Sequence, residues 1–221
     1  ESFPESNTFN FLDVFRNIKD PSLQALQICK TIRSNANATT TGKAQGDPFF
    51  DDNGAKIAAA AMLTAHWVAE KLSRPDLATM PFAYSVLDLP DLPQRIDAAI
   101  DTLPLAARTL FKSLIAAGDD KGKNKTQGSL LATAEQILSG FALPALIPSC
   151  GLPGDCPGFF PDEPLKMEGK QLCVFGIDQD IDSVVIPIIA AAVEQIGRYN
   201  LNNSRPRQKP LVFSFDEFAA L

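Results

Sequence analysis

The sequence is poor in the residues on which several classes of protein depend. Four cysteines in 221 residues are too few for a disulfide scaffold. The only histidine, His66, cannot by itself supply an ordinary zinc site or a catalytic pair of imidazoles. The longest apolar run, residues 57–69, falls short of the roughly 20 residues that cross a bilayer, and it contains Thr64. We therefore expect neither a metal site nor a membrane span.

Positive charge is also scarce. The chain has 20 basic and 26 acidic residues, for a net charge of −6, which argues against a dedicated basic nucleic-acid module. Apolar residues make up 45% of it, enough for a packed core. No signal-peptide pattern follows Glu1, the first residue is not Met, and the last residue, Leu221, directly follows a motif. We expect a soluble piece of a larger protein from a reducing compartment.

Helical periodicity dominates the first two thirds of the chain. Asp20 is a natural N-cap for a first helix, and the polar residues 34–46 predict a loop after it. Asn53 can cap a long alanine-rich helix that ends near Leu72, and further amphipathic stretches follow it. Residues 49–147 are therefore predicted to form an all-helical block.

The pattern changes in the last third. Six prolines and three glycines between Pro144 and Pro164 predict a loop. Residues 171–177 and 211–215 are short apolar runs typical of buried strands, and residues 182–199 between them are helical in pattern, with Asp182 or Ser183 as the cap. Strand, helix and strand in this order predict a βαβ unit and a parallel sheet.

The second predicted strand ends in two acids, Asp216 and Glu217. Ligands bind beyond the carboxyl ends of parallel strands, and two acids there are typical of a Walker B segment that holds Mg²⁺ and polarises water on a γ-phosphate. The alternative is that the pair begins a loop or caps the next helix. The phosphate loop that should accompany it is absent, because Gly42 and Lys43 are followed by Ala44 rather than Ser or Thr.

Residues 215–221, Phe-Asp-Glu-Phe-Ala-Ala-Leu, resemble the DEFA-x-L Walker B segment of type IV secretion coupling proteins, the TraG/TraD family of conjugative DNA-transfer ATPases. Four other stretches are similar to segments of that family in the same order: residues 9–13, 47–51, 126–133 and 170–177. The resemblance therefore extends over most of the chain, although only its last segment is specific.

The resemblance implies an α-rich mixed α/β fold, with an all-helical domain inserted in a partial RecA-like nucleotide-binding domain with a parallel sheet. The implied domains are residues 1–47 and 151–221 for the nucleotide-binding parts and 48–150 for the all-α domain. In the full-length parent, Asp216 would bind Mg²⁺ through water and Glu217 would be the catalytic base.

The resemblance also implies a biological setting. The parent would be a homo-hexameric, ATP- and Mg²⁺-dependent DNA translocase on the cytoplasmic face of the bacterial inner membrane. It would take relaxase, other relaxosome proteins and DNA to the components of a secretion channel. Without a Walker A motif this piece would hydrolyse no ATP, need no cofactor and act in recognition. The alternatives are a free-standing helical interaction module, or a piece of another RecA-like DNA motor.

Three weaker signals remain. Lys121, Lys123 and Lys125 could contact DNA phosphates, or could be a solvated turn. His66, beside Trp67, is interpreted as a core or boundary residue. Four acids could form a negative face for a basic protein partner: Asp88, Asp91, Asp97 and Asp101.

Overall fold

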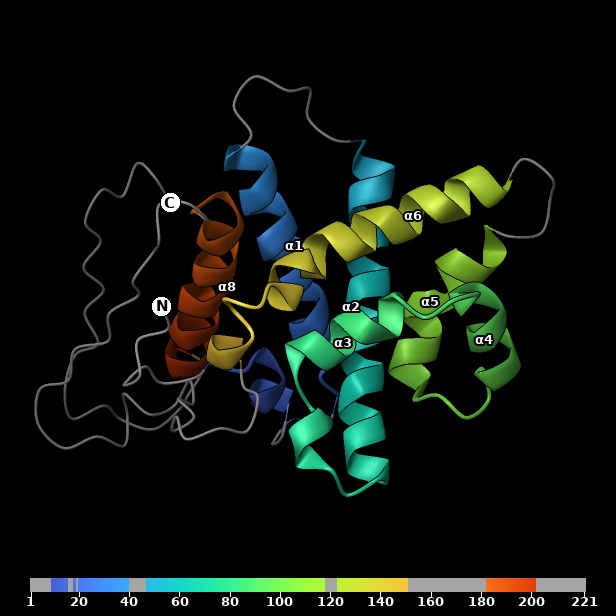
Figure 1. Cartoon of the computed structure of the whole chain (residues 1–221), viewed down its shortest axis with the longest axis horizontal. Coiled ribbons are helices and arrows are strands. Elements are labelled where there is room, and N and C mark those ends of the chain that lie inside the picture. The colour runs from blue at the N-terminus through green and yellow to red at the C-terminus, as the bar shows by residue number, and fades with distance from the viewer. Residues whose placement is uncertain are drawn as a thin grey trace, which may run out of the picture.

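The computed structural model describes residues 9–15, 18, 20–39, 47–117, 123–150 and 182–201, and every regular element in these ranges is helical (Figure 1). The 3-10 helices are η1 (Phe11–Phe15), η2 (Pro75–Leu77), η3 (Ser139–Ala142) and η4 (Pro148–Cys150). The α-helices are α1 (Ser22–Thr39), α2 (Pro48–Lys71), α3 (Met80–Leu87), α4 (Leu92–Ala99), α5 (Leu105–Ala116), α6 (Lys123–Leu138) and α8 (Asp182–Leu201).

Helix α2 is the central element, and α1, α3, α5 and α6 pack around it (Figure 1). It begins where Asp47 caps it: the Asp47 carboxylate accepts a hydrogen bond from the Phe49 backbone N–H at 2.9 Å, and Pro48 occupies the first turn. The predicted cap, Asn53, lies inside the helix instead and donates to the Phe49 carbonyl at 2.8 Å. The long alanine-rich helix is confirmed, but it starts earlier than predicted.

Small side chains let the neighbours of α2 come close. An ideal Cβ built on Gly54 would lie 2.5 Å from the Thr133 side chain of α6, so only glycine fits at this crossing. The first half of α2 carries a run of alanines that are all buried: Ala55, Ala58, Ala59, Ala60 and Ala61. Alanine has high helix propensity and little bulk, so this half suits both a stable helix and tight packing.

Helix α1 extends through Thr39, so the loop predicted for residues 34–46 is wrong for its first part; residues 40–46 lie outside the described ranges. No apolar stripe marks this extension of α1. The helix continues here because polar side chains of α1 form hydrogen bonds to α2. The Arg33 Nε donates to Asp51 at 2.7 Å, and the Asn37 amide donates to the other oxygen of Asp51 at 3.0 Å.

The described residues of the predicted helical block, 49–147, are confirmed as helical: α2 to α6 and the 3-10 turns between and after them. One cluster of buried side chains joins the three predicted domains, because Ile28, Ala58 and Ala191 all belong to it. The division into domains at residues 47 and 150 stays a prediction.

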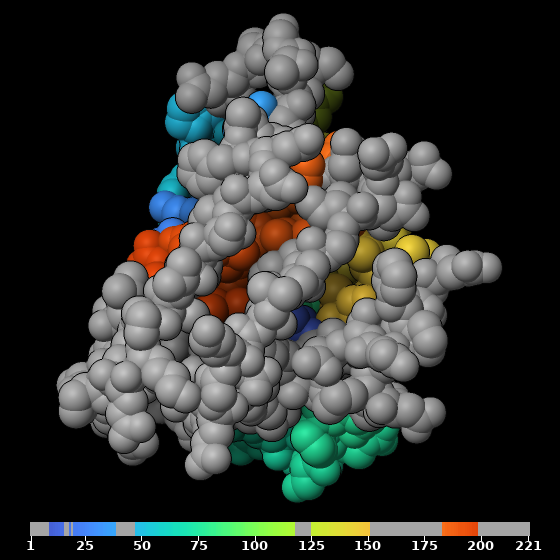
Figure 2. All heavy atoms as spheres, turned by 90° about the vertical axis from the view of Figure 1, so that its left-hand side faces the viewer, coloured from blue at the N-terminus to red at the C-terminus, as the bar shows by residue number. Residues whose placement is uncertain are grey.

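The predicted fold class, a mixed α/β fold with a partial RecA-like parallel sheet, is wrong: the described ranges contain no strand and form an all-helical fold. The predicted strands, residues 171–177 and 211–215, lie outside those ranges. The helix predicted between them is confirmed as α8, and among the described residues α1 and η3 pack against it. Four of its buried residues recur at helical spacing: Val185, Ile189, Ala192 and Ile196. Figure 2 shows α8 beside the segment that contains η3 on one face of the molecule.

Candidate functional site

Most of the residues predicted to carry chemistry lie outside the described part of the chain. Asp216 and Glu217 are among them, as is Lys121. Lys123 is the first residue of α6, and Lys125, two positions later, is exposed. The roles predicted for these residues, as a Mg²⁺ ligand, a catalytic base and DNA contacts, stay predictions.

The structure offers no metal centre within its described ranges, where no group of three His, Cys, Asp or Glu side chains comes together. Cys29 and Cys150 are free thiols, and both are buried. The Cys29 thiol lies 3.5 Å from the Met62 sulfur, and burial raises its pKa. Burial also raises the pKa of Cys150, to about 12, so both are inert thiols that fill the core.

Helix α2 opens onto a cavity of about 640 Å³ along its second half. The opposite walls are the segment before α1 and the start of α5. The lining residues come from these three parts of the chain: Phe15, Ile18, Asp20, Pro21 and Ser22; Leu63, His66, Trp67 and Glu70; Pro104, Leu105, Ala106, Thr109 and Leu110. Its volume lies in the range typical of ligand-binding clefts, and most of its lining is apolar.

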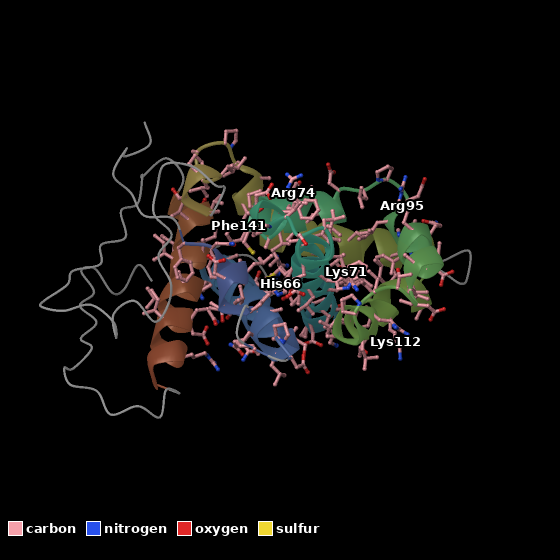
Figure 3. All side chains as sticks on the ribbon, turned by 90° about the horizontal axis from the view of Figure 1, so that it is seen from below. His66, Lys71, Arg74, Arg95, Lys112 and Phe141 are labelled. Atoms are coloured by element: carbon pink, nitrogen blue, oxygen red, sulfur yellow. The ribbon has the colours of Figure 1, made fainter. Side chains whose placement is uncertain are left out.

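The wall formed by α2 contains the only histidine and the only tryptophan of the chain, His66 and Trp67. The His66 Nε2 lies 3.5 Å from a carboxylate oxygen of Glu70, one turn later, and the Phe15 ring meets the imidazole edge-on at 5.7 Å (His66 is labelled in Figure 3). The His66 side chain is only 14% exposed, whereas that of Glu70 is 66% exposed. The histidine is thus held in place while the carboxylate can turn toward a ligand.

Asp20 lies on the opposite wall. Its carboxylate accepts the Ser22 backbone N–H at 3.1 Å. Hydrogen bonds from Ser22 hold the Asp20 pKa below its ordinary value, so this wall keeps a negative charge at neutral pH. Asp20 and Glu70 are therefore two carboxylates on two different elements of one cavity.

One leucine of the lining is strongly exposed: Leu105 is 73% exposed. Leu23 follows the lining residue Ser22 in sequence and is 74% exposed, but it is not part of the lining. Single exposed leucines are common on protein surfaces, so the exposure of Leu105 matters because it lies at the cavity.

A second polar cluster, which the sequence did not reveal, joins α1 to α8. Glu194 accepts hydrogen bonds from Gln27 at 3.1 Å, from Thr31, and from Arg198 at 2.6 Å. These bonds occupy both carboxylate oxygens of Glu194. We interpret the cluster as a clamp between two helices rather than a ligand site.

The four acids of the predicted negative face are all exposed around α4: Asp88, Asp91, Asp97 and Asp101. Asp101 lies 3.5 Å from Arg108, and Arg95 lies on α4 itself, so positive charges interrupt the face. None of these acids is among the lining residues of the cavity beside α2. Their predicted role in partner binding is not tested by this arrangement.

Sequence reasoning missed the cavity. It interpreted His66 as a core or boundary residue, which agrees with its low exposure, but did not connect it with Glu70 or with Asp20. One signal was available: His66, Trp67 and Glu70 lie close together near the end of a helix whose middle is a run of alanines. Bulky and ionisable residues grouped in such a helix indicate that the neighbouring elements stand further away there.

No helix in the described ranges is both long and apolar enough to cross a bilayer. Comparisons of the chain with protein-family models, with curated proteins and with solved structures find no match.

Proposed function

We propose that this chain is a partner-recognition part of a conjugative coupling protein, and that it docks a polypeptide segment in the cavity between α1, α2 and α5. The observation that carries the docking role is the cavity itself: a cleft of about 640 Å³ whose lining combines apolar and polar residues, with Leu105 exposed at its edge. Clefts between helices commonly take the apolar face of a partner segment.

The link to coupling proteins comes from the resemblance at residues 215–221 and at the four similar stretches before them. On this proposal the partner is a relaxase or another relaxosome protein. ATP and Mg²⁺ belong to the hexameric parent, in which Asp216 and Glu217 would act. The chain acts by binding, since its sequence has no GxxxxGK[ST] phosphate loop.

The test is the affinity of the chain for a fluorescently labelled relaxase, measured by anisotropy. Leu105→Asp places a charge in the cavity lining at the first position of α5, where an acid is compatible with the helix. We expect it to weaken binding at least about ten-fold. The matched control is Leu72→Asp, at a residue that is 60% exposed and does not line the cavity. Equal binding by both variants would rule out docking at this cavity.

DNA binding is measured in parallel across a salt series. The Lys121/Lys123/Lys125→Ala triple variant should leave relaxase binding unchanged if the cavity is the docking site. Loss of salt-sensitive DNA binding in this variant would assign the lysine cluster to DNA. Loss of relaxase binding in the same variant would instead show that relaxase binds at the lysine cluster near the start of α6.

A further inference from the structure

The walls of the cavity combine apolar surface with negative charge. Phe15, Leu63 and Leu110 supply apolar surface on three sides. Asp20 and Glu70 are the acidic residues of the lining, and no described lining residue is a lysine or an arginine. Arg16 and Lys19, close by in sequence, lie outside the described ranges. An apolar segment that carries a positive charge matches this lining better than a neutral or acidic one.

Trp67 adds a second attraction for a cation. The face of an indole ring attracts an ammonium or guanidinium group, more strongly than the ring of Phe or Tyr. Trp67 and Glu70 are three residues apart on α2, so they are neighbours on the same face of the helix. A cation held there would meet both the ring and the carboxylate.

A ligand can reorient the side chain of Glu70. Its carboxylate lies 3.5 Å from the His66 imidazole, longer than a good hydrogen bond, and its side chain is mostly exposed. A bound cation can draw Glu70 away from His66 at little cost, because a contact of this length holds it weakly. Asp20, held by Ser22, then faces the cation from the opposite wall of the cavity.

We infer that Trp67, Glu70 and Asp20 form a subsite for an alkylammonium or guanidinium group, and that the docked partner segment presents a lysine or arginine among apolar residues. This inference rests on the proposed docking function, and it names the chemistry of the segment that the cavity selects. The aliphatic stem of such a side chain packs on the apolar walls while its head reaches the two carboxylates.

The only tryptophan of the chain lines the subsite, so its fluorescence reports directly on occupancy. The probes are 2-phenylethylammonium and 2-phenylethanol, which have the same apolar body and differ in charge. We expect the ammonium probe to bind about three- to ten-fold more tightly than the alcohol. Glu70→Gln and Asp20→Asn should each remove most of this preference while leaving the affinity for the alcohol unchanged.

Asn is also a good N-cap, so Asp20→Asn keeps the start of α1 intact. Asp97→Asn, at an exposed acid of α4 that does not line the cavity, is the control for a general loss of charge, and it should change neither affinity.

A second arm uses two peptides with the same apolar residues, one with lysines and one with acetyl-lysines. The lysine peptide should bind more tightly than the acetyl-lysine peptide, by about the same factor that separates 2-phenylethylammonium from 2-phenylethanol. If 2-phenylethylammonium binds more tightly than 2-phenylethanol but the two peptides bind equally, the assignment of the subsite to a partner side chain is overturned.

The outcomes separate the two proposals. Equal binding of ammonium and alcohol would overturn the cationic subsite and leave docking at the cavity intact. No fluorescence response to either probe, with circular dichroism showing a folded chain, would also overturn the subsite. The docking function itself fails if Leu105→Asp binds relaxase as well as Leu72→Asp does, whichever way the two probes bind.

Discussion

The two halves of α2 pack in opposite ways. The first half, from Pro48 to Ala61, contains Gly54 and five buried alanines, and α6 approaches it so closely that Gly54 has no room for a Cβ. The second half, from Met62 to Lys71, carries Leu63, Trp67 and other large side chains, and there the neighbours leave a cavity of about 640 Å³.

The difference shows how one helix can serve both stability and recognition. Small residues bring the neighbouring helices together and exclude a cleft, because interiors pack to a uniform density. In the second half Met62 and Leu63 are buried, whereas Trp67 is half-buried and Glu70 is exposed, so the last turns of α2 keep surface available. Polar contacts follow the same division: Asp51 and Asp52 hold the first half to α1, while His66 and Glu70 face the cavity.

The largest effect on stability is expected in the first half. Ile57 is completely buried, so Ile57→Ala should lower the free energy of unfolding by about 2–5 kcal/mol. Leu72→Ala, at a 60% exposed residue beyond the other end of α2, should change it by less than about 0.5 kcal/mol. Urea denaturation measures both. Similar losses in the two variants would contradict the packing described for the first half.

A single methyl group tests the crossing with α6. Gly54→Ala places a Cβ 2.5 Å from Thr133, whose hydroxyl is held by the Ser129 carbonyl, and should cost about 1–3 kcal/mol despite the higher helix propensity of alanine. Gly128→Ala, where a Cβ meets nothing within 4 Å, should instead stabilise by up to about 1 kcal/mol.

Thr133→Ser removes the methyl group that crowds Gly54 and keeps the hydroxyl. It should therefore recover part of the loss in the Gly54→Ala variant, and thermal unfolding of the single and double variants measures this coupling. Additive effects of the two substitutions would show that the close approach is not what limits residue 54.

Substitution in the second half should separate binding from stability. Trp67→Phe keeps an aromatic ring at a half-buried position and should cost only about 1 kcal/mol in unfolding free energy. It should weaken relaxase binding by a larger factor than Ile57→Ala does, with both measured well below their unfolding temperatures. The opposite ranking would indicate that the first half of α2 carries the binding surface.

The end of α2 should accept a small stabilisation. The Ser73 backbone is left-handed, with φ of 52°, and the Arg74 N–H donates to the Ala69 carbonyl at 2.8 Å, as in a Schellman motif. Ser73→Gly should therefore raise stability by about 0.5–1 kcal/mol, because glycine adopts this conformation without strain. Thermal unfolding measures the change, and a lower melting temperature would contradict the assignment of this motif.

The smallest effect concerns pH. Hydrogen bonds from Lys30 and Lys56, each 2.6 Å from the carboxylate, lower the pKa of Asp52. Because the folded pKa lies below the unfolded value of about 3.9, the contribution is complete above that pH and is lost as pH falls through the folded pKa.

This partly exposed group should contribute no more than about 0.5 kcal/mol. Asp52→Asn should therefore reduce stability slightly at pH 7 and leave it unchanged near pH 2, as followed by urea denaturation. A loss of the same size at both pH values would show that the carboxylate charge is not involved.

The sequence predicted where the helices lie better than it predicted which elements pack against them. Alanine density revealed α2, although its cap is Asp47 rather than the predicted Asn53, and apolar spacing revealed α8, because both signals are local. The extension of α1 to Thr39 was missed, since hydrogen bonds from Arg33 and Asn37 to Asp51 stabilise it and no apolar stripe marks it. The sheet was predicted from two apolar runs outside the described ranges, and the helix between them packs on α1 instead.

The cavity escaped prediction for a related reason. Asp20, Trp67 and Leu105 are far apart in sequence, and nothing in their local patterns states that they line one space. The motif at residues 215–221 suggested a nucleotide site, and those residues lie outside the described ranges.

The sequence by itself determined most of the helical stretches, where several of them begin or end, and which face of several is apolar, because these properties depend on residues within a few turns of one another. Only the tertiary structure decided what covers each apolar face, and it left the second half of α2 partly uncovered between Asp20 and Leu105. The reason is physical: burial is shared between elements distant in the chain, so whether a large side chain fills a core or lines a cleft depends on how closely its neighbours approach.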